Sequence, residues 1–180
     1  MDTKSILEKV RSGDMSVEDA LSLLKRQPFE DMEFAKPDFH RSLRTGFAEV
    51  IYCEGKPDEY IVSIFKKLLE AEGEVFGTRA SRHQFELVQR EIPDIEYDPV
   101  SRVLFLEKKD KELTGNIAIC IGGTADIPMA EEAARTAEFF GSRAERIYDV
   151  GITGLHRIIS SMEQLQKANC VIAVAGMEGA

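Results

Sequence analysis

The sequence lacks the features of a membrane, secreted or nucleic-acid-binding protein. Its 23 Lys and Arg stand against 32 Asp and Glu, which gives a formal net charge of −9. That balance works against non-specific binding to nucleic acid or to a membrane, because both need clustered positive charge. No apolar run approaches the roughly 20 residues of a membrane-spanning helix. The first residues begin a charged amphipathic segment rather than a signal peptide.

Metal and cofactor motifs are also missing. Cys53, Cys120 and Cys170 are odd in number and far apart, and no CxxC pair occurs. This pattern disfavours a disulfide scaffold and a zinc ribbon, so we expect a reducing cytoplasm and no metal site. Neither the G-x-G-x-x-G nor the P-loop spacing is present, which disfavours Rossmann cofactors and P-loop nucleotides. We expect no tightly bound cofactor.

What the sequence does contain is enough apolar material, 43% of 180 residues, to bury a core. Hydrophobic spacing divides the chain into three parts. Residues 1–27 predict a helical hairpin, residues 28–110 a smaller α/β unit, and residues 115–180 a more regular domain. Within the α/β unit we expect strands and helices to alternate, ending in a strand or hairpin near residues 97–106. The charged run after Glu107 predicts a solvated linker.

The third part has a β-α-β-α-β pattern. We expect its strands and helices, in chain order, at residues 116–121, 128–140, 146–148, 154–167 and 170–174. Right-handed crossovers make such strands parallel, so the fold class is α/β with a three-layer parallel sheet. Residues 176–180 look like a strand-to-helix turn with no helix after it. We therefore expect a fragment of a longer protein, or a second subunit over an open apolar face.

Glycine-containing loops follow all three late strands, and parallel strands place such loops at one edge of the sheet, where ligands bind. The loops comprise residues 122–126, 149–154 and 176–179. Gly122 and Gly123 have no Cβ, so their backbone can approach a ligand closely. The N–H groups that open the next helix suit a phosphate. Against this, Glu131 and Glu132 lie in the first turns of that helix and weaken an anion site.

Polar residues near these loops have two interpretations each. Asp126 is a helix N-cap or a polar group at the ligand edge. His156, near the start of a helix, is a structural or exposed histidine or a general base. Arg157 beside it is a solvated charge or a phosphate clamp.

Charged residues of the smaller α/β unit crowd around Gly46 and Gly55. They form an ion-paired turn region, or cationic contacts to a carboxylate or phosphate, and spacing does not separate the two interpretations. Arg79, which follows a strand, is able to join the set. The other charged members are Asp38, Arg41, Arg44, Glu49 and Lys56.

Four runs resemble one known family. They are GGTADIPMAEEA from Gly122, YDVGITGLHR from Tyr148, VAGMEGA from Val174, and DFHRSLRTGFAEV from Asp38. Together they resemble the nickel-pincer-nucleotide biosynthesis carboxylases (pyridinium-3,5-biscarboxylic acid mononucleotide synthases), relatives of the phosphoribosylaminoimidazole (AIR) carboxylases. The run from Asp38 separates this family from the plain purine-pathway enzymes. The resemblance covers almost the whole chain and implies an AIR-carboxylase-like, flavodoxin-like fold.

The resemblance also implies an activity. The family carboxylates the pyridine ring of nicotinic acid adenine dinucleotide with carbon dioxide or bicarbonate, and hydrolyses the phosphoanhydride to release AMP. We therefore expect a small-molecule dinucleotide substrate and a symmetric homo-oligomer. By residue matching, the resemblance implies that the polar side chains acting at the pyridine ring are Asp126, His156 and Glu178. Nucleotide contacts fall to Gly122, Gly123, Thr124, Ala125, Gly176, Met177 and Gly179.

Two departures from the family pattern limit this expectation. Ala125 stands where the family usually has serine. The family's nucleophilic cysteine, which adds to the ring, belongs to a region beyond Ala180, so we expect this chain not to complete the reaction. Two alternatives stay open: an aminoimidazole ribonucleotide carboxylase of purine biosynthesis, and a non-catalytic nucleotide-binding or oligomerisation module.

Overall fold

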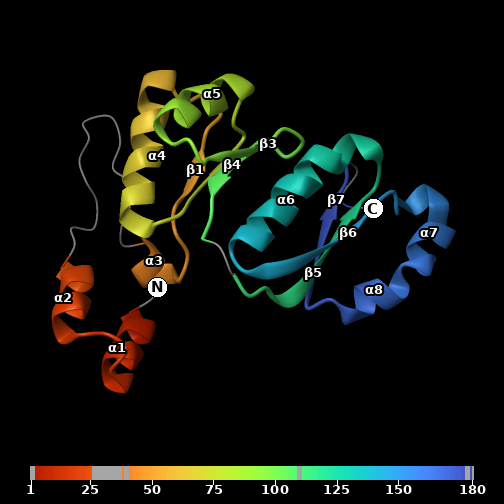
Figure 1. Ribbon diagram of the computed structural model, residues 1–180. Helices are drawn as coiled ribbons and strands as arrows, with labels where there is room; N and C mark the ends of the chain where they lie inside the picture. Colours follow the sequence, from red (N-terminus) through yellow and green to blue (C-terminus); the bar gives the residue numbers. More distant parts are fainter. Residues whose placement is uncertain (1–2, 26–37, 39–40, 109–110, 177–178, 180) are drawn as a thin grey trace.

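The computed structural model describes residues 3–25, 38, 41–108, 111–176 and 179 (Figure 1). The predicted helical hairpin is present as α1 (Thr3–Ser12) and α2 (Val17–Lys25), which contact each other. Ile6 of α1 and Ala20 of α2 are buried, so each helix turns one apolar position inward. Ser16 caps α2, because its hydroxyl oxygen accepts the Asp19 N–H at 3.0 Å.

A four-stranded mixed sheet forms the first unit, the α/β part that precedes residue 110. Its strand order is β1-β2-β4-β3, in which β1 and β2 are parallel and the other pairs are antiparallel. Of the two alternatives left open near residues 97–106, a strand or a hairpin, the structure has the hairpin, formed by β3 and β4. The strands are β1 (Val50–Tyr52), β2 (Val75–Thr78), β3 (Glu96–Asp98) and β4 (Val103–Leu106); the helices are α3 (Arg41–Thr45), α4 (Asp58–Glu72) and α5 (Arg82–Glu91).

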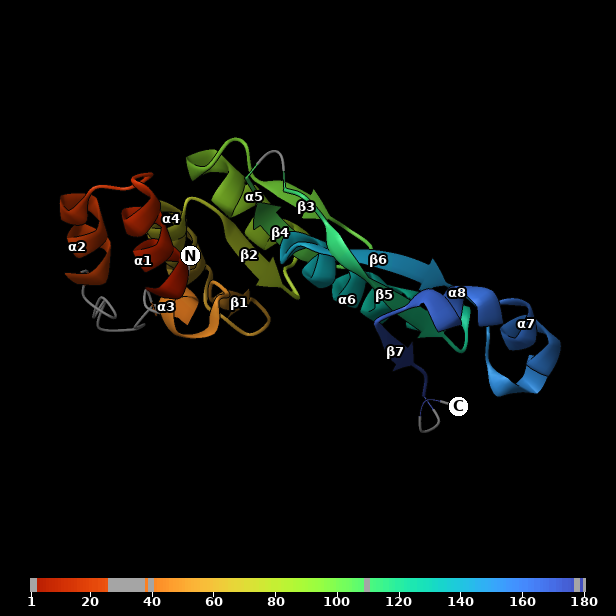
Figure 2. The same ribbon diagram turned by 90° about the horizontal axis from the view of Figure 1, so that it is seen from below.

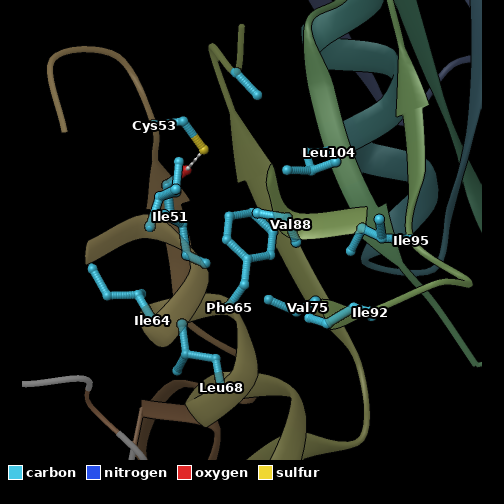
Figure 3. Packing of buried hydrophobic residues seen from close by; sticks show 12 residues of the cluster. Ile51, Cys53, Ile64, Phe65, Leu68, Val75, Val88, Ile92, Ile95 and Leu104 are labelled. Atoms are coloured by element: carbon cyan, nitrogen blue, oxygen red, sulfur yellow. Dashed lines mark hydrogen bonds between the residues drawn. The ribbon is translucent and has the colours of Figure 1, made fainter. Parts of the chain in front are cut away.

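Local signals explain the two longer helices of this unit. Helix α4 carries an apolar stripe and ends at Gly73, whose φ of 72° is the left-handed conformation that glycine tolerates best. Helix α5 begins with a capping box, in which Ser81 and Gln84 exchange side-chain-to-backbone hydrogen bonds. Both helices pack on one face of the mixed sheet, and Figure 3 shows Phe65 of α4 among Val75 and Val88.

Alternation along the strands gives the mixed sheet two buried faces. Val75 and Leu104 belong to the core under α4 and α5, whereas their neighbours Phe76 and Phe105 belong to a second core that contains Phe139. This period of two is the expected pattern for strands covered on both sides. Phe139 ends the helix α6 (Ile127–Phe139) of the following unit, so the two units share a packed interface.

The second unit, from residue 111 onward, is built on a parallel sheet in the order β6-β5-β7. Ile119 and Ile121 of β5 face α6, and the alternate residues Ala118 and Cys120 face the helices on the other side. The predicted α/β fold with a three-layer parallel sheet is confirmed. The remaining elements are β5 (Thr114–Ile121), η1 (Thr124–Asp126), β6 (Ser142–Ile147), η2 (Ile152–Gly154), α7 (Leu155–Ser160), α8 (Met162–Lys167) and β7 (Cys170–Val174).

Helix α6 is therefore the central layer of the molecule (Figures 1 and 2). One side presents small residues such as Ala130 and Ala134 to β5, which lets helix and sheet approach closely. The other side reaches the mixed sheet through Phe139, whose ring centroid is 4.6 Å from that of Phe76. Movement of α6 is consequently restricted by both sheets.

Three expectations need correction. The single helix predicted at residues 154–167 is divided at Ser161, because the hydroxyls of Ser160 and Ser161 both donate to the Arg157 carbonyl and compete with the helical ladder. The continuous apolar run at residues 170–174 predicts a buried strand with Cys170 inside it, and this is wrong, since β7 is an edge strand and the Cys170 side chain is exposed. The linker is only partly solvated, because the Lys111 ammonium lies 2.7 Å from a carboxylate oxygen of Glu74.

Candidate functional site

The glycine loops after the three parallel strands meet at one edge. The Gly122 N–H donates to the Val174 carbonyl at 3.1 Å, and the Val150 N–H donates to the Ile121 carbonyl at 2.9 Å. At Gly151 the fit is so close that a Cβ would lie 2.6 Å from the Gly122 carbonyl oxygen. Glycine is therefore required at residue 151 by the contact between two loops.

A cavity of about 120 Å³ opens beside these loops. Gly122, Gly151 and Gly179 line it, so each of the three loops contributes. Apolar side chains of the sheet and of α7 and α8, including Cys120, Ile158 and Leu165, form the rest of the wall. Its volume is below the roughly 300 Å³ at which typical ligand pockets begin, so a larger molecule must extend along the open edge.

The loop from Gly122 to Asp126 is a bend followed by the short turn η1, which leads directly into α6. Thr124 and Ala125 are exposed there. Asp126 occupies the N-cap position of α6, yet its carboxylate makes no capping hydrogen bond within the described chain. The predicted N-cap position of Asp126 is therefore confirmed, but its side chain does not cap the helix, and the partly exposed carboxylate remains at the edge.

His156 and Arg157 open α7 at the same edge, but they differ in environment. His156 is exposed. Arg157 is partly buried and forms an ion pair with Asp149, which lies in the loop just after β6 and has a φ of 56°. A positive φ outside glycine is a sparsely populated conformation that clusters at functional sites. The Arg157 Nε is buried without a hydrogen-bond partner among the described residues.

The two acidic residues near the start of α6, which the sequence predicts to weaken an anion site, both form ion pairs with arginines in the structure. Glu131 accepts from the Arg146 guanidinium, with both carboxylate oxygens 3.0 Å from Nε, and from the Tyr148 hydroxyl. Glu132 lies 2.9 Å from the Arg79 Nε. Burial and the bond to Glu131 raise the pKa of Tyr148, and the bond to Glu132 raises the pKa of Arg79.

Cationic residues of the first unit are not all brought to this edge. Arg44 pairs with Asp38, and Arg41 lies with it in α3, before the start of β1. Lys56 follows the carboxyl end of β1, so the set is divided between opposite ends of the strand. A second cavity of about 280 Å³ lies beside α3 and is lined by Phe47, Lys108 and Phe140 among others. It touches Gly141, which precedes β6, and is thus at the edge opposite the glycine loops.

The three cysteines are free thiols. Burial raises the pKa of Cys53 to about 12 and also raises the pKa of Cys120, so both are neutral packing groups. The described residues contain no cluster of three or more His, Cys, Asp or Glu able to hold a metal ion. Within the same part of the chain, no helix is both long and apolar enough to cross a bilayer.

Two partners were not identifiable from the sequence. The pairing of Asp149 with Arg157 depends on the left-handed backbone conformation of Asp149. The local sequence does not predict this conformation, because Asp149 is not a glycine. The pairing of Arg79 with Glu132 joins residues 53 positions apart. Met177 and Glu178 lie outside the described residues, and Gly176 is exposed at the start of the last loop.

Comparison with known proteins places the chain. A family model described as the LarB/PurE-like N-terminal domain matches residues 29–109. A relative from Methanocaldococcus jannaschii, "Uncharacterized protein MJ0165", is 34% identical over 189 aligned residues, which cover 98% of this chain and 73% of the relative. The chain belongs to the LarB/PurE-like family. This membership confirms the AIR-carboxylase-like part of the resemblance and supports a carboxylase-type enzyme.

The LarB/PurE-like match covers one part of the molecule, and the alignment with the relative covers nearly all of it. The family model spans the mixed sheet of the first unit, whereas the alignment with the relative includes both sheets and the glycine loops. The candidate edge therefore lies within the region shared with the relative.

Proposed function

We propose that this LarB/PurE-like protein carboxylates the pyridine ring of nicotinic acid adenine dinucleotide. In the proposed reaction a ring carbon loses a proton and forms a bond to carbon dioxide, supplied as such or from bicarbonate. Water cleaves the phosphoanhydride, so AMP leaves together with a doubly carboxylated pyridine mononucleotide. No electrons are gained or lost overall, which agrees with the expectation of no tightly bound redox cofactor.

The observation that carries the proposal is the contact between Gly122 and Gly151, since it holds two glycine loops together at the carboxyl edge of the sheet. Open parallel sheets bind ligands at this position. Backbone without side chains allows phosphates to approach the N–H groups of the loop and of the α6 N-terminus. A dinucleotide has two such phosphates and is long enough to extend beyond the cavity of about 120 Å³.

We assign roles to the side chains at this edge as follows. Arg157 binds a phosphate, because it is a guanidinium at this edge and its fork geometry matches a phosphate. Asp126 and His156 take part in proton transfer, because both are accessible at the edge where the ring carbon must lose its proton. Lys56, at the carboxyl end of β1, is a more distant contact for the anionic ligand, whereas Arg41 and Arg44 lie at the opposite edge.

The test is product analysis with the full-length protein, nicotinic acid adenine dinucleotide and ¹³C-bicarbonate. We expect AMP and a doubly carboxylated mononucleotide that carries the isotope in one carboxylate. The absence of both products overturns the proposal. Aminoimidazole ribonucleotide is the comparison substrate, and its carboxylation in place of the dinucleotide identifies a purine-pathway enzyme. Binding of the dinucleotide without turnover identifies a non-catalytic module.

A further inference from the structure

Negative charge at the start of α6 is the main obstacle to an anionic ligand at the proposed site. Glu132 is six residues beyond Asp126, about 9 Å along the helix axis. This distance is comparable to the Debye length at physiological salt, roughly 8 Å, so an uncompensated carboxylate there repels a phosphate on the loop. The charge must be balanced if the helix N-terminus is to attract an anion.

Glu131 and Glu132 are balanced from different directions. Arg146 of β6 binds Glu131 within the second unit. The partner of Glu132 is Arg79, which follows β2 of the first unit. The Arg79 and Glu132 side chains are only 31% and 21% exposed, and the Arg79 guanidinium also lies 3.3 Å from the Met129 sulfur. Arg79 therefore covers the two turns of α6 that are nearest the glycine loop.

Arg79 is held in a conformation that the chain would not adopt locally. Its φ is 57°, and the φ of Arg102 across the loop is 56°. Such values cost a non-glycine residue on the order of 1–3 kcal/mol, so the surroundings must enforce them. They do so through hydrogen bonds: the Ala80 N–H donates to the Arg102 carbonyl at 2.8 Å, and the Arg102 guanidinium donates to the Arg79 carbonyl at 3.1 Å.

We infer that Arg79 is a positioning residue of the ligand edge: the first unit supplies its charge to neutralise Glu132, and α6 can then accept an anionic nucleotide. The inference rests on the proposed function only in requiring a phosphate-bearing ligand at this edge. Arg79 acts through Glu132 and has no part in the chemical step. A residue of the first unit thereby sets the charge at a site that is formed by residues of the second unit.

A double-mutant cycle on AMP binding separates this electrostatic role from a structural one. We expect Arg79→Gln to weaken AMP binding about three- to tenfold, since it exposes one carboxylate charge at roughly 9 Å. Glu132→Gln removes that charge, so affinity should stay equal or rise, and the double variant should bind like the wild type. Arg79→Lys should retain affinity within about threefold because it keeps the charge. The loss in Arg79→Gln should shrink as salt is added.

The matched control is Arg135→Gln. This substitution also removes one positive charge and one ion pair between the units, because Arg135 pairs with Asp98. Arg135, however, lies a turn beyond Glu132 along α6. We expect little change in AMP affinity. If Glu132→Gln loses as much affinity as Arg79→Gln and the double variant is no better, Arg79 is only a clamp and the inference is overturned.

Unfolding midpoints identify any variant that fails to fold, and Glu132→Gln leaves the strained residue untouched. Equal AMP binding by the wild type and Arg79→Gln overturns the inference alone. Failure of the wild type to bind AMP at any salt overturns the proposed nucleotide site itself, and the inference falls with it.

Discussion

The two sheets of this protein use similar apolar strands but differ in how completely they are covered. In the mixed sheet, the successive residues Val75 and Phe76 of β2 are both buried, because α4 and α5 lie on one face and α6 on the other. In the parallel sheet, α6 buries Ile119 and Ile121 on one face, yet Val171 of β7 is 51% exposed. The short helices α7 and α8 leave further apolar side chains in contact with solvent.

This difference indicates that the first unit contributes more to stability and the second unit more to binding. The first unit concentrates buried apolar contacts, which contribute most of the free energy of folding. The second unit places glycine loops and charged pairs at an open edge, where the local free energy of opening is lower. Function is expected at such an edge, and α6 connects it to the better-packed sheet.

The largest effect is expected from Phe65→Ala in the core of the first unit. Phe65 is fully buried between α4 and the mixed sheet (Figure 3). Its removal should lower the free energy of unfolding by about 3–5 kcal/mol, measured by denaturant titration. The matched control is Phe47→Ala, since Phe47 is 53% exposed and should lose under about 1.5 kcal/mol. Equal losses would contradict the contrast in packing.

A smaller effect is expected from Gly151→Ala at the ligand edge. The added methyl meets the Gly122 carbonyl oxygen and must separate two loops, which should cost about 1–3 kcal/mol of stability and weaken AMP binding. Gly123→Ala is the control for stability, because its Cβ would meet no described atom within 4 Å. An unchanged unfolding midpoint in Gly151→Ala would mean that the loops are not in contact.

The interface between the units should make stability depend on acid. Burial disfavours the charged form of Asp98, but hydrogen bonds from the Val100 N–H and the Arg135 guanidinium outweigh this and lower its pKa. A lowered pKa stabilises the fold above the ordinary range of the carboxyl, and that stability is lost as the pH falls through the folded pKa.

Asp98→Asn should therefore cost about 1 kcal/mol at pH 7 and reduce the loss of stability on acidification. Thermal unfolding between pH 7 and pH 3 measures both effects. Asp94→Asn, at an exposed carboxylate in the same unit, is the control. The same acid dependence in Asp98→Asn and in the wild type would contradict the role of this pair.

Cysteine labelling tests the difference in packing between the two sheets without any substitution, so the smallest effect on stability is expected here. Iodoacetamide at neutral pH should modify Cys170, which is exposed on β7. Cys53 should resist until denaturant is added, because burial raises its pKa to about 12 and the thiolate is the reactive form. Peptide mass spectrometry counts the adducts. Rapid labelling of Cys53 in the folded protein would contradict the packing of the first unit.

The elements that could be predicted are those with strong local signals. The apolar stripe of α4, the capping box at Ser81 and the continuous strand that ends at Ile121 are all encoded within a few residues. The exposure of Cys170 could not be read in the same way, because the same apolar strand pattern occurs in central and edge strands. Burial there depends on neighbours elsewhere in the chain.

In the candidate site, too, features encoded by local sequence could be predicted, and features that depend on distant residues could not. The convergence of the glycine loops was predictable, since parallel strands place their carboxyl ends together. The neutralisation of Glu132 was not, because Arg79 belongs to another unit and reaches α6 only when both units are folded. Asp126 was equally ambiguous, as a favourable N-cap residue type does not prove that the cap is made.

Backbone amide shifts measured by NMR during titration with AMP test the central claim most directly. We predict saturable changes confined to residues 122–128, 150–157 and 174–176, with little change in α1 and α2. Changes centred instead on the opposite cavity, at Phe47, Lys108 and Phe140, or no saturable change at all, would contradict a nucleotide site at the glycine-loop edge.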